Sequence, residues 1–264
     1  MEKVRRNSQF IFFIFCLAVS TCLIGRARDP ANRFPSYPYI TGDGFRAYCD
    51  FVFDETNPCF QPKNIRNGNT IFVKTEYLQY FFTQFHKLIH AKYIIVSHNS
   101  DLPAPGFGLE YLNDEKLIAW FAQNVDVSHP KLIPIPIGIE NRYCSHGPLP
   151  GIDPAEGFEI DKTDLLYMNF SLSTCPPERG RAFELFKDQP FCKVSFPKAY
   201  NLFLEEAAHS KFVLSPRGNG WDCHRTWEAL YIGSIPIVKT SACNPMFDGL
   251  PVVIVNVCSA LFQF

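Results

Sequence analysis

The stretch from Lys211 to Lys239 reads KFVLSPRGNGWDCHRTWEALYIGSIPIVK. A short apolar run at its start and another at its end predict two buried strands. Between them lie a loop with two glycines and a segment, residues 223–232, whose apolar side chains recur at helical spacing. We expect Asp222 to cap this helix and Gly233 to end it in the left-handed conformation. The stretch therefore predicts the order strand, glycine loop, helix, strand.

The same alternation extends along most of the chain. Strands are predicted at residues 69–75, 91–101 and 164–170, with a proline-bearing short or edge strand at 131–142. Helices are predicted at residues 76–90, 112–124, 176–190 and 200–210. Residues 28–69, rich in proline, asparagine, glycine and aromatic side chains, are predicted to be loops packed on the body. Apolar strands that alternate with helices predict an α/β fold with parallel sheets covered on both faces.

A polar, proline-bearing segment at residues 142–162 divides this pattern into two Rossmann-like halves. The predicted domains are residues 29–150, with a loop-rich start, and residues 160–264. With 264 residues, 47% of them hydrophobic and 19% charged, the chain can bury a substantial core. The formal net charge of -1 gives no general attraction to nucleic acid. Any bound anion must therefore be held by a local site.

The first 28 residues have the pattern of a secretory address. Lys3, Arg5 and Arg6 precede an apolar run from Phe10 to Ile24. This run is shorter than the roughly 20 residues that a helix needs to cross a typical bilayer. Two alternatives stay open, a signal peptide cleaved near Ala27 and a short type II membrane anchor. Either segment predicts that the protein enters the secretory pathway and lies at the ER or Golgi membrane, facing the lumen. A secreted protein or a protein of a bacterial envelope are the alternatives.

Eight of the ten cysteines lie outside the apolar run. In an exported chain so many thiols indicate disulfide bonds. Cys49 and Cys59 are close enough in sequence to staple a local loop, although spacing alone does not determine the pairing. The sequence contains no C-x-x-C pair of the kind that many zinc sites use, so we predict no metal site.

The glycine loop at residues 215–220 and the helix after it form a predicted anion site. Unpaired amides and the positive end of the helix dipole favour a negative charge there, and Arg217 adds a guanidinium suited to bidentate phosphate contact. Arg225 and Glu228 are three residues apart, so a cation and a carboxylate can meet one ligand from the same helix face. The alternative is an ordinary salt bridge beside a tight turn. The loop matches neither the P-loop nor the dinucleotide-binding motif.

Residues 215–238, SPRGNGWDCHRTWEALYIGSIPIV, resemble the signature block of the exostosin-type glycosyltransferases. In that block a Pro-Arg-Gly loop precedes an Arg and an E-A-L-x-x-G-x-I-P element. The segments YIIVSHNSD, WFAQN, HPKLIPIPIGIENR and NFSLSTCPPERG are more loosely similar to the body of related proteins. The resemblance implies a GT-B fold, in which two Rossmann-like halves face each other. The first half then binds the acceptor and the second the nucleotide-sugar donor.

Carried over residue by residue, the resemblance assigns Arg217 and Arg225 to the donor diphosphate and Glu228 to its ribose, with Gly218 and Gly220 giving backbone access. The implied activity moves a sugar from a nucleotide-sugar donor to a glycan or other hydroxyl acceptor. No Asp-x-Asp pair occurs, so no visible motif requires a metal. The alternatives are a catalytically inactive relative that binds glycans or partner proteins, and another GT-B transferase such as a fucosyltransferase.

His98, Asn99 and Asp101 follow the predicted strand at residues 91–101, near its carboxyl end. Open α/β sheets place ligand contacts at such strand ends, so these side chains are candidates for the cleft. Asp101 is the candidate catalytic base that takes a proton from the acceptor hydroxyl. The alternative is a turn rich in Asn and Asp that caps the next segment.

Three further candidates lie in the second half. Asn169 begins an Asn-Phe-Ser sequence, which predicts either a glycosylation site or, at a strand end, a side chain that lines the cleft. Arg179 and Arg181 follow a double proline at a predicted helix start, where they could reach a phosphate; the expected alternative is a solvated helix face. Residues 257–264, VCSALFQF, depart from the acidic, helix-forming continuation expected in the family. This departure predicts that the second half is truncated and lacks its last helix.

Overall fold

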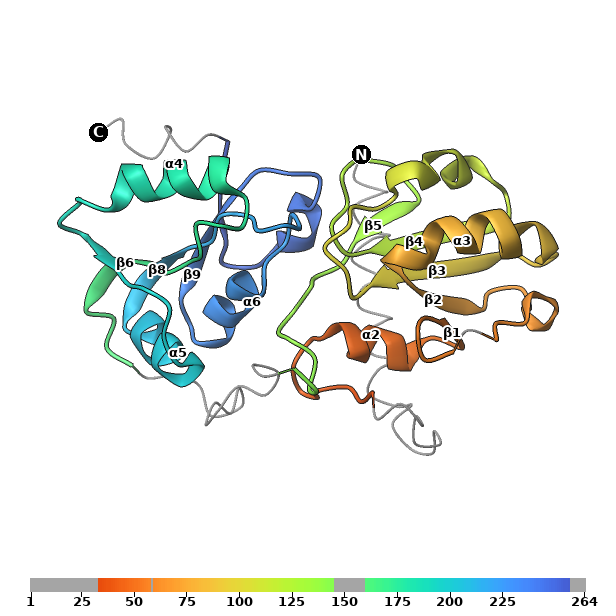
Figure 1. The fold of residues 1–264 in the computed structure, drawn as a ribbon, viewed down its shortest axis with the longest axis horizontal. Coiled ribbons are helices and arrows are strands. Elements are labelled where there is room, and N and C mark those ends of the chain that lie inside the picture. Colours follow the sequence, from red (N-terminus) through yellow and green to blue (C-terminus); the bar gives the residue numbers. More distant parts are fainter. Residues whose placement is uncertain (1–32, 58, 145–159, 257–264) are drawn as a thin grey trace. The chain divides into compact units, whose positions relative to one another are not determined.

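The computed structural model describes residues 33–57, 59–144 and 160–256. These residues form two sheets of five strands each, and every strand pair is parallel (Figure 1). The first sheet consists of β1 (Phe51–Phe53), β2 (Thr70–Lys74), β3 (Tyr93–His98), β4 (Leu117–Ala122) and β5 (Leu132–Pro134). The second consists of β6 (Asp164–Met168), β7 (Cys192–Val194), β8 (Ser210–Leu214), β9 (Ile235–Lys239) and β10 (Val253–Val255). The predicted α/β class is confirmed.

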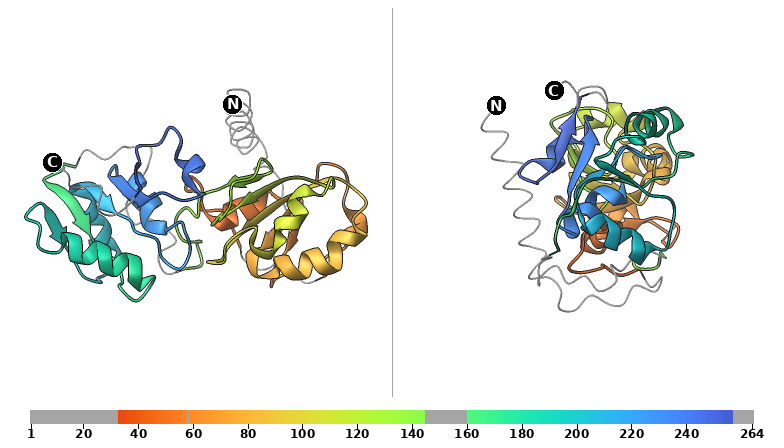
Figure 2. Two further views of the ribbon diagram at one scale, coloured as in Figure 1. Left: turned by 90° about the horizontal axis from the view of Figure 1, so that it is seen from above. Right: turned by 90° about the vertical axis from the view of Figure 1, so that its left-hand side faces the viewer.

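Helices cover both faces of the second sheet. On one face, Leu166 and Met168 of β6 and Leu214 of β8 pack against α4 (Pro176–Phe186). On the other face, Tyr167 and Val213 pack against α5 (Tyr200–Ala208) and α6 (His224–Tyr231). Successive residues of a strand point to opposite faces of the sheet, so a continuous apolar run such as DLLYM packs against the helices on both faces. Figures 1 and 2 show α4 on the side of the sheet opposite to α5 and α6.

The strand order of the second sheet is β10-β9-β8-β6-β7. The chain runs outward from β6 to β7, then crosses back to β8 on the other side of β6 and continues outward. The direction of winding therefore reverses between β6 and β8. In open parallel sheets, ligands bind beyond the carboxyl ends of the two strands at such a reversal. Those ends carry Asn169 after β6 and the glycine loop after β8.

The first sheet has the sequential order β1-β2-β3-β4-β5. One face packs against a helical stretch that combines a 3₁₀ turn (Thr75–Tyr77), α3 (Leu78–Tyr80), a π-helical segment (Phe81–Phe85) and a second 3₁₀ turn (His86–Leu88). The helix predicted at residues 76–90 is therefore present, with irregular geometry. The other face buries Phe72, Val96 and Phe121 together with Phe45 of α2 (Gly42–Tyr48).

Two predictions about the first half are wrong. Residues 112–124 do not form a helix, because Leu117–Ala122 is strand β4, paired with β3 and β5. The hydrophobic pattern of a short buried run fits a helix and a strand equally well, and hydrogen bonding to neighbouring strands determines which one forms. Residues 28–69 are not only loops, since they include α2 and β1. Thr41 begins α2, and its hydroxyl accepts a hydrogen bond from the Gly44 amide at 3.1 Å.

Some of the remaining structural predictions fall on residues that the structure describes, and others fall outside them. The short edge strand is confirmed as β5, and Gly233 has a φ of 70° after α6. The predicted signal or anchor segment and the altered tail lie outside the described residues.

Contacts between residues divide the chain into two compact units, Met1–Phe34 and Pro35–Phe264, and all helices and strands named above belong to the second unit. Within the described ranges, no helix is long and apolar enough to span a bilayer.

Cys59, Cys175, Cys192, Cys223 and Cys243 are free thiols in this structure. Cys59 is exposed and forms no disulfide bond with Cys49, so the disulfide considered for this local loop is absent. Burial raises the pKa of Cys192 to about 11 and that of Cys243 to about 12. Such thiols behave as small apolar side chains rather than as nucleophiles.

Candidate functional site

The glycine loop is held in shape by contacts within itself. The guanidinium of Arg217 stacks on the ring of Trp221, with its central carbon 4.0 Å from the ring centroid. Its Nη2 donates to the backbone carbonyl of Asn219 at 3.1 Å. Arg217 is half-buried, so the cation predicted to contact phosphate lies on the loop with part of its surface in solvent.

A second arginine, Arg179 on α4, reaches the same loop. Its Nε donates to the carbonyl of Arg217 at 2.9 Å and its Nη1 to the carbonyl of Ser171 at 2.9 Å. Only 6% of Arg179 is exposed, so the expectation of a solvated side chain is wrong, whereas Arg181 is exposed as expected. The sequence did contain a signal for this, because Ala182 and Phe186 follow Arg179 at helical spacing and are buried.

Arg225 lies close to Arg179 and lacks acceptors. Its Nε and Nη1 are buried and have no hydrogen-bond partner among the described residues. Both guanidinium carbons lie 5.7 Å from the centroid of the Phe170 ring. Burial lowers the pKa of Arg225, and the positive charge of Arg179 lowers it further. A buried cation beside a like charge is unfavourable unless an anion joins them.

Glu228 lies one helical turn after Arg225 on α6. It is 6% exposed, and its Oε1 accepts a hydrogen bond from the Tyr200 hydroxyl at 3.0 Å. Burial raises the pKa of this carboxyl group, although the nearby Arg225 charge opposes the shift. Arg225 and Glu228 form no ion pair in the described structure, which excludes the alternative of an ordinary surface salt bridge.

Gly218 and Gly220 allow close approach of side chains from elsewhere in the chain. A Cβ at Gly218 would lie 3.0 Å from Nη2 of Arg179, and one at Gly220 only 2.4 Å from Nδ2 of Asn124. Neither glycine has a positive φ. Their present role is therefore to let Arg179 and Asn124 pack against the loop backbone.

Asp222 does not cap α6, because the N-cap residue is Cys223. Its buried carboxylate accepts hydrogen bonds from the Ile137 amide at 2.8 Å, the Trp227 indole at 2.8 Å and the Cys223 amide at 2.9 Å. Burial raises the pKa of Asp222 to about 6 despite these donors. The side chain therefore connects the segment after β5 to the start of α6.

His98 and Asn99 belong to a polar network at the end of β3. The imidazole of His98 donates through Nε2 to the Pro136 carbonyl at 3.0 Å, and its Nδ1 accepts from the Asn99 amide at 2.7 Å. Burial lowers the pKa of His98 to about 4, so the ring is neutral at pH 7. Nδ2 of Asn99 donates to the Asp43 carboxylate at 3.1 Å, and Oδ1 of Asn99 accepts from Nδ2 of Asn141 at 3.0 Å.

The other two strand-end candidates have different surroundings. Asp101 is exposed, and its Oδ2 accepts a hydrogen bond from Nδ2 of Asn219 in the glycine loop at 3.1 Å. Asn169 is buried, and its Nδ2 donates to the Tyr167 hydroxyl at 3.2 Å and to the Phe196 carbonyl at 3.1 Å. Asn169 therefore ties the turn after β7 to the end of β6.

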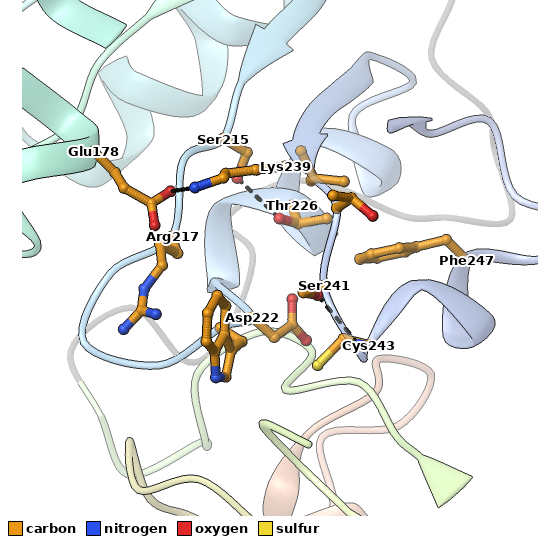
Figure 3. A pocket seen from close by; sticks show the side chains of 12 residues that line it. Glu178, Ser215, Arg217, Asp222, Thr226, Lys239, Ser241, Cys243 and Phe247 are labelled. Carbon is orange, nitrogen blue, oxygen red and sulfur yellow. Dashed lines mark hydrogen bonds and ion pairs between the residues drawn. The ribbon is translucent and has the colours of Figure 1, made fainter. Parts of the chain in front are cut away.

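Two cavities lie near these residues. One, of about 20 Å³, lies beside the glycine loop and has room for about one water molecule. Figure 3 shows its wall, in which Lys239 pairs with Glu178 at 3.3 Å and the Ser215 and Thr226 hydroxyls lie 2.9 Å apart. The other, of about 340 Å³, is lined mainly by residues of the first half, among them His98, Asn99, Asp101 and Glu140, and by His224 of α6.

Comparison with known proteins adds no assignment: no family model matches the chain, and no curated protein matches it. Among the described residues, no three His, Cys, Asp or Glu side chains gather as a metal ion would need.

Proposed function

We propose that this chain is an exostosin-type glycosyltransferase that moves a sugar from a nucleotide-sugar donor to a hydroxyl acceptor. The donor diphosphate binds beyond the carboxyl ends of β6 and β8, between Arg179, Arg225 and the glycine loop. This position is the one that the reversed strand order favours for a ligand. The proposal includes a GT-B arrangement of the two sheets and a location in the lumen of the secretory pathway.

One observation carries the proposal, the pair Arg179 and Arg225. A guanidinium has five N–H donors, and burying donors without acceptors costs about 1–3 kcal/mol for each group, more when it is charged. Arg225 has two buried nitrogens without a hydrogen-bond acceptor, and it lies beside a second cation, Arg179. A diphosphate has several acceptor oxygens and a negative charge, so it would accept hydrogen bonds from the unpaired donors and would neutralise the two cations.

The neighbouring side chains fit the rest of a nucleotide-sugar. Glu228 provides a carboxylate that can accept two hydrogen bonds from a ribose diol, and Tyr200 already holds one of its oxygens. Arg217 lies at the exposed side of the loop, where it can move from Trp221 to a phosphate. During transfer, these cations and the start of α6 would stabilise the leaving diphosphate.

The test is calorimetric titration of the protein from residue 35 onward with UDP, GDP, ADP and CDP, together with the Arg225→Met variant. We expect one nucleoside diphosphate to bind, and the variant to lose at least about 10-fold in affinity, since a charged hydrogen bond contributes about 1.5–3 kcal/mol. The base that binds also distinguishes an exostosin-type donor from the GDP-sugar of a fucosyltransferase.

The matched control is Arg181→Met, which removes an exposed arginine from α4. Urea unfolding of the apo proteins separates loss of binding from loss of fold. We expect Arg225→Met to be no less stable than the wild type, because it removes a buried charge that has no acceptor. Binding of no nucleoside diphosphate by the folded wild type would contradict the transferase proposal and favour the binding-module alternative.

A further inference from the structure

The pocket of about 340 Å³ has the size of a small-ligand site and a polar wall. Carboxylates, amides and imidazoles surround it, among them those of Glu76, Asp101, Gln123, Glu140, Asn141 and His224. Side chains with both donors and acceptors suit a ligand covered with hydroxyl groups, since each hydroxyl donates one hydrogen bond and accepts others. The pocket therefore fits a saccharide better than an apolar ligand or a second anion.

Two histidines line the pocket, and their ring nitrogens differ in availability. Both nitrogens of His98 are used by the Pro136 carbonyl and the Asn99 amide. His224, the first residue of α6, lies with Nδ1 2.7 Å from the carbonyl of Gly138. A carbonyl only accepts, so Nδ1 carries the proton and Nε2 keeps its lone pair. His224 thus offers an oriented, half-buried acceptor nitrogen at the pocket wall.

The same pocket borders the proposed donor site. His224 precedes Arg225 directly on α6, and Glu228 lies one turn further along. Burial raises the pKa of Glu228, and the charge of Glu140, which lines the pocket, adds to the shift. Asp101 lines the pocket too and hydrogen-bonds to Asn219 of the glycine loop. A ligand in the pocket would therefore lie beside a nucleotide-sugar bound at the arginine pair.

We propose that this pocket binds the acceptor saccharide and that His224 is the base that deprotonates it. The inference rests on the proposed function. The acceptor hydroxyl oxygen forms a bond to the anomeric carbon of the donor sugar, and its proton passes to Nε2 of His224. The bond between the anomeric carbon and the diphosphate oxygen breaks, and the diphosphate leaves with the electron pair.

Asp101 is the competing base, and the structure favours His224 over it. Asp101 is exposed and already accepts a hydrogen bond from Asn219. The His224 ring is instead oriented by the Gly138 carbonyl, which leaves Nε2 as its second ring nitrogen at the pocket wall. The role that the geometry gives Asp101 is to accept a hydrogen bond from an acceptor hydroxyl while it holds the glycine loop.

The experiment uses p-nitrophenyl monosaccharides as acceptors and the sugar nucleotides of whichever nucleoside diphosphate binds. Saturation-transfer NMR measures acceptor binding, and nucleotide release measures transfer. His224→Gln should lower kcat by about 100- to 10,000-fold, the usual contribution of a general base. It should leave the affinity for the nucleoside diphosphate within about 2-fold. Asp101→Asn should raise the acceptor KM and leave kcat within a few-fold.

His90→Gln is the control, since His90 is exposed and lies outside the pocket. A wild-type protein that binds a nucleoside diphosphate but none of the monosaccharides overturns this inference and leaves the donor site standing. Unchanged kcat in His224→Gln, or a loss of kcat in Asp101→Asn as large as that expected for His224→Gln, overturns the assignment of the base. Failure to bind any nucleoside diphosphate instead counts against the proposed function itself.

Discussion

The Nε of Arg179 donates a hydrogen bond to the backbone carbonyl of Arg217 at 2.9 Å. This contact joins α4 to the glycine loop, two segments that are 38 residues apart in the sequence. The shape of the loop therefore depends on a side chain outside the stretch that resembles the exostosin block. It also fixes Arg179 beside Arg225, where the two charges share the ring of Phe170.

Replacing Arg179 by lysine should loosen the loop. A lysine keeps the charge but cannot donate to the Arg217 carbonyl, the Ser171 carbonyl and the Thr174 hydroxyl from one planar group. We expect the free energy of unfolding to fall by about 1–3 kcal/mol, the effect of losing hydrogen bonds from a charged group. Affinity for the nucleoside diphosphate should fall with it. Urea denaturation and calorimetry measure the two effects, and an Arg181→Lys variant with the same losses would contradict the assignment.

Gly220→Ala should destabilise the protein, whereas Gly180→Ala should not. The added methyl group at Gly220 would lie 2.4 Å from Nδ2 of Asn124, so the Asn124 contact with Asp222 must shift. Overpacking of this kind costs about 1–3 kcal/mol. Gly180 lies in α4 with no atom within 4 Å of the added group, where alanine is the better helix former by about 1 kcal/mol. Thermal unfolding of the two variants should shift in opposite directions.

Glu228→Gln should remove discrimination between a nucleoside diphosphate and its 2′-deoxy analogue. Glutamine still accepts the Tyr200 hydroxyl, so the local fold is preserved. We expect the wild type to prefer the ribonucleotide by about 10-fold or more, the worth of a charge-assisted hydrogen bond. In the variant the preference should fall to a few-fold. Equal discrimination by both proteins in calorimetry would show that the carboxylate does not contact the ribose.

His98 should make the protein less stable in acid. Burial lowers the pKa of His98 to about 4 in the folded chain, against 6.5 as the reference value. The unfolded state therefore binds more protons between these two values. Its contribution to stability is fully present above about pH 6.5 and is lost as the pH falls toward 4, to a total of about 3 kcal/mol.

The His98→Gln variant isolates this contribution. Glutamine cannot be protonated in this range, so the stability advantage of the wild type should shrink steadily from pH 7 to pH 4. Urea unfolding at each pH measures the difference between the two proteins. A difference that does not change with pH would mean that His98 titrates normally in the folded state.

The sequence by itself determined the local order of elements wherever apolar runs, glycines and helical spacing agreed. The stretch from Lys211 to Lys239 is the clearest case, because β8, the loop, α6 and β9 all follow from short-range preferences. It also placed Arg217, Arg225 and Glu228 near one strand end. The misassigned strand β4 shows where this reasoning stops, since a buried apolar run becomes a strand only when neighbouring strands offer it pairing.

Tertiary structure alone decided which charges are buried and which groups meet. It buries Arg179, leaves two nitrogens of Arg225 without acceptors and uses Asp222 as an acceptor for the segment after β5 instead of as a helix cap. It also brings His224 to the wall of a pocket formed largely by residues before position 145. Desolvation and hydrogen bonding depend on atoms that are close in space, and the Ile137 amide and the Asp222 carboxylate that it meets lie 85 residues apart in the chain.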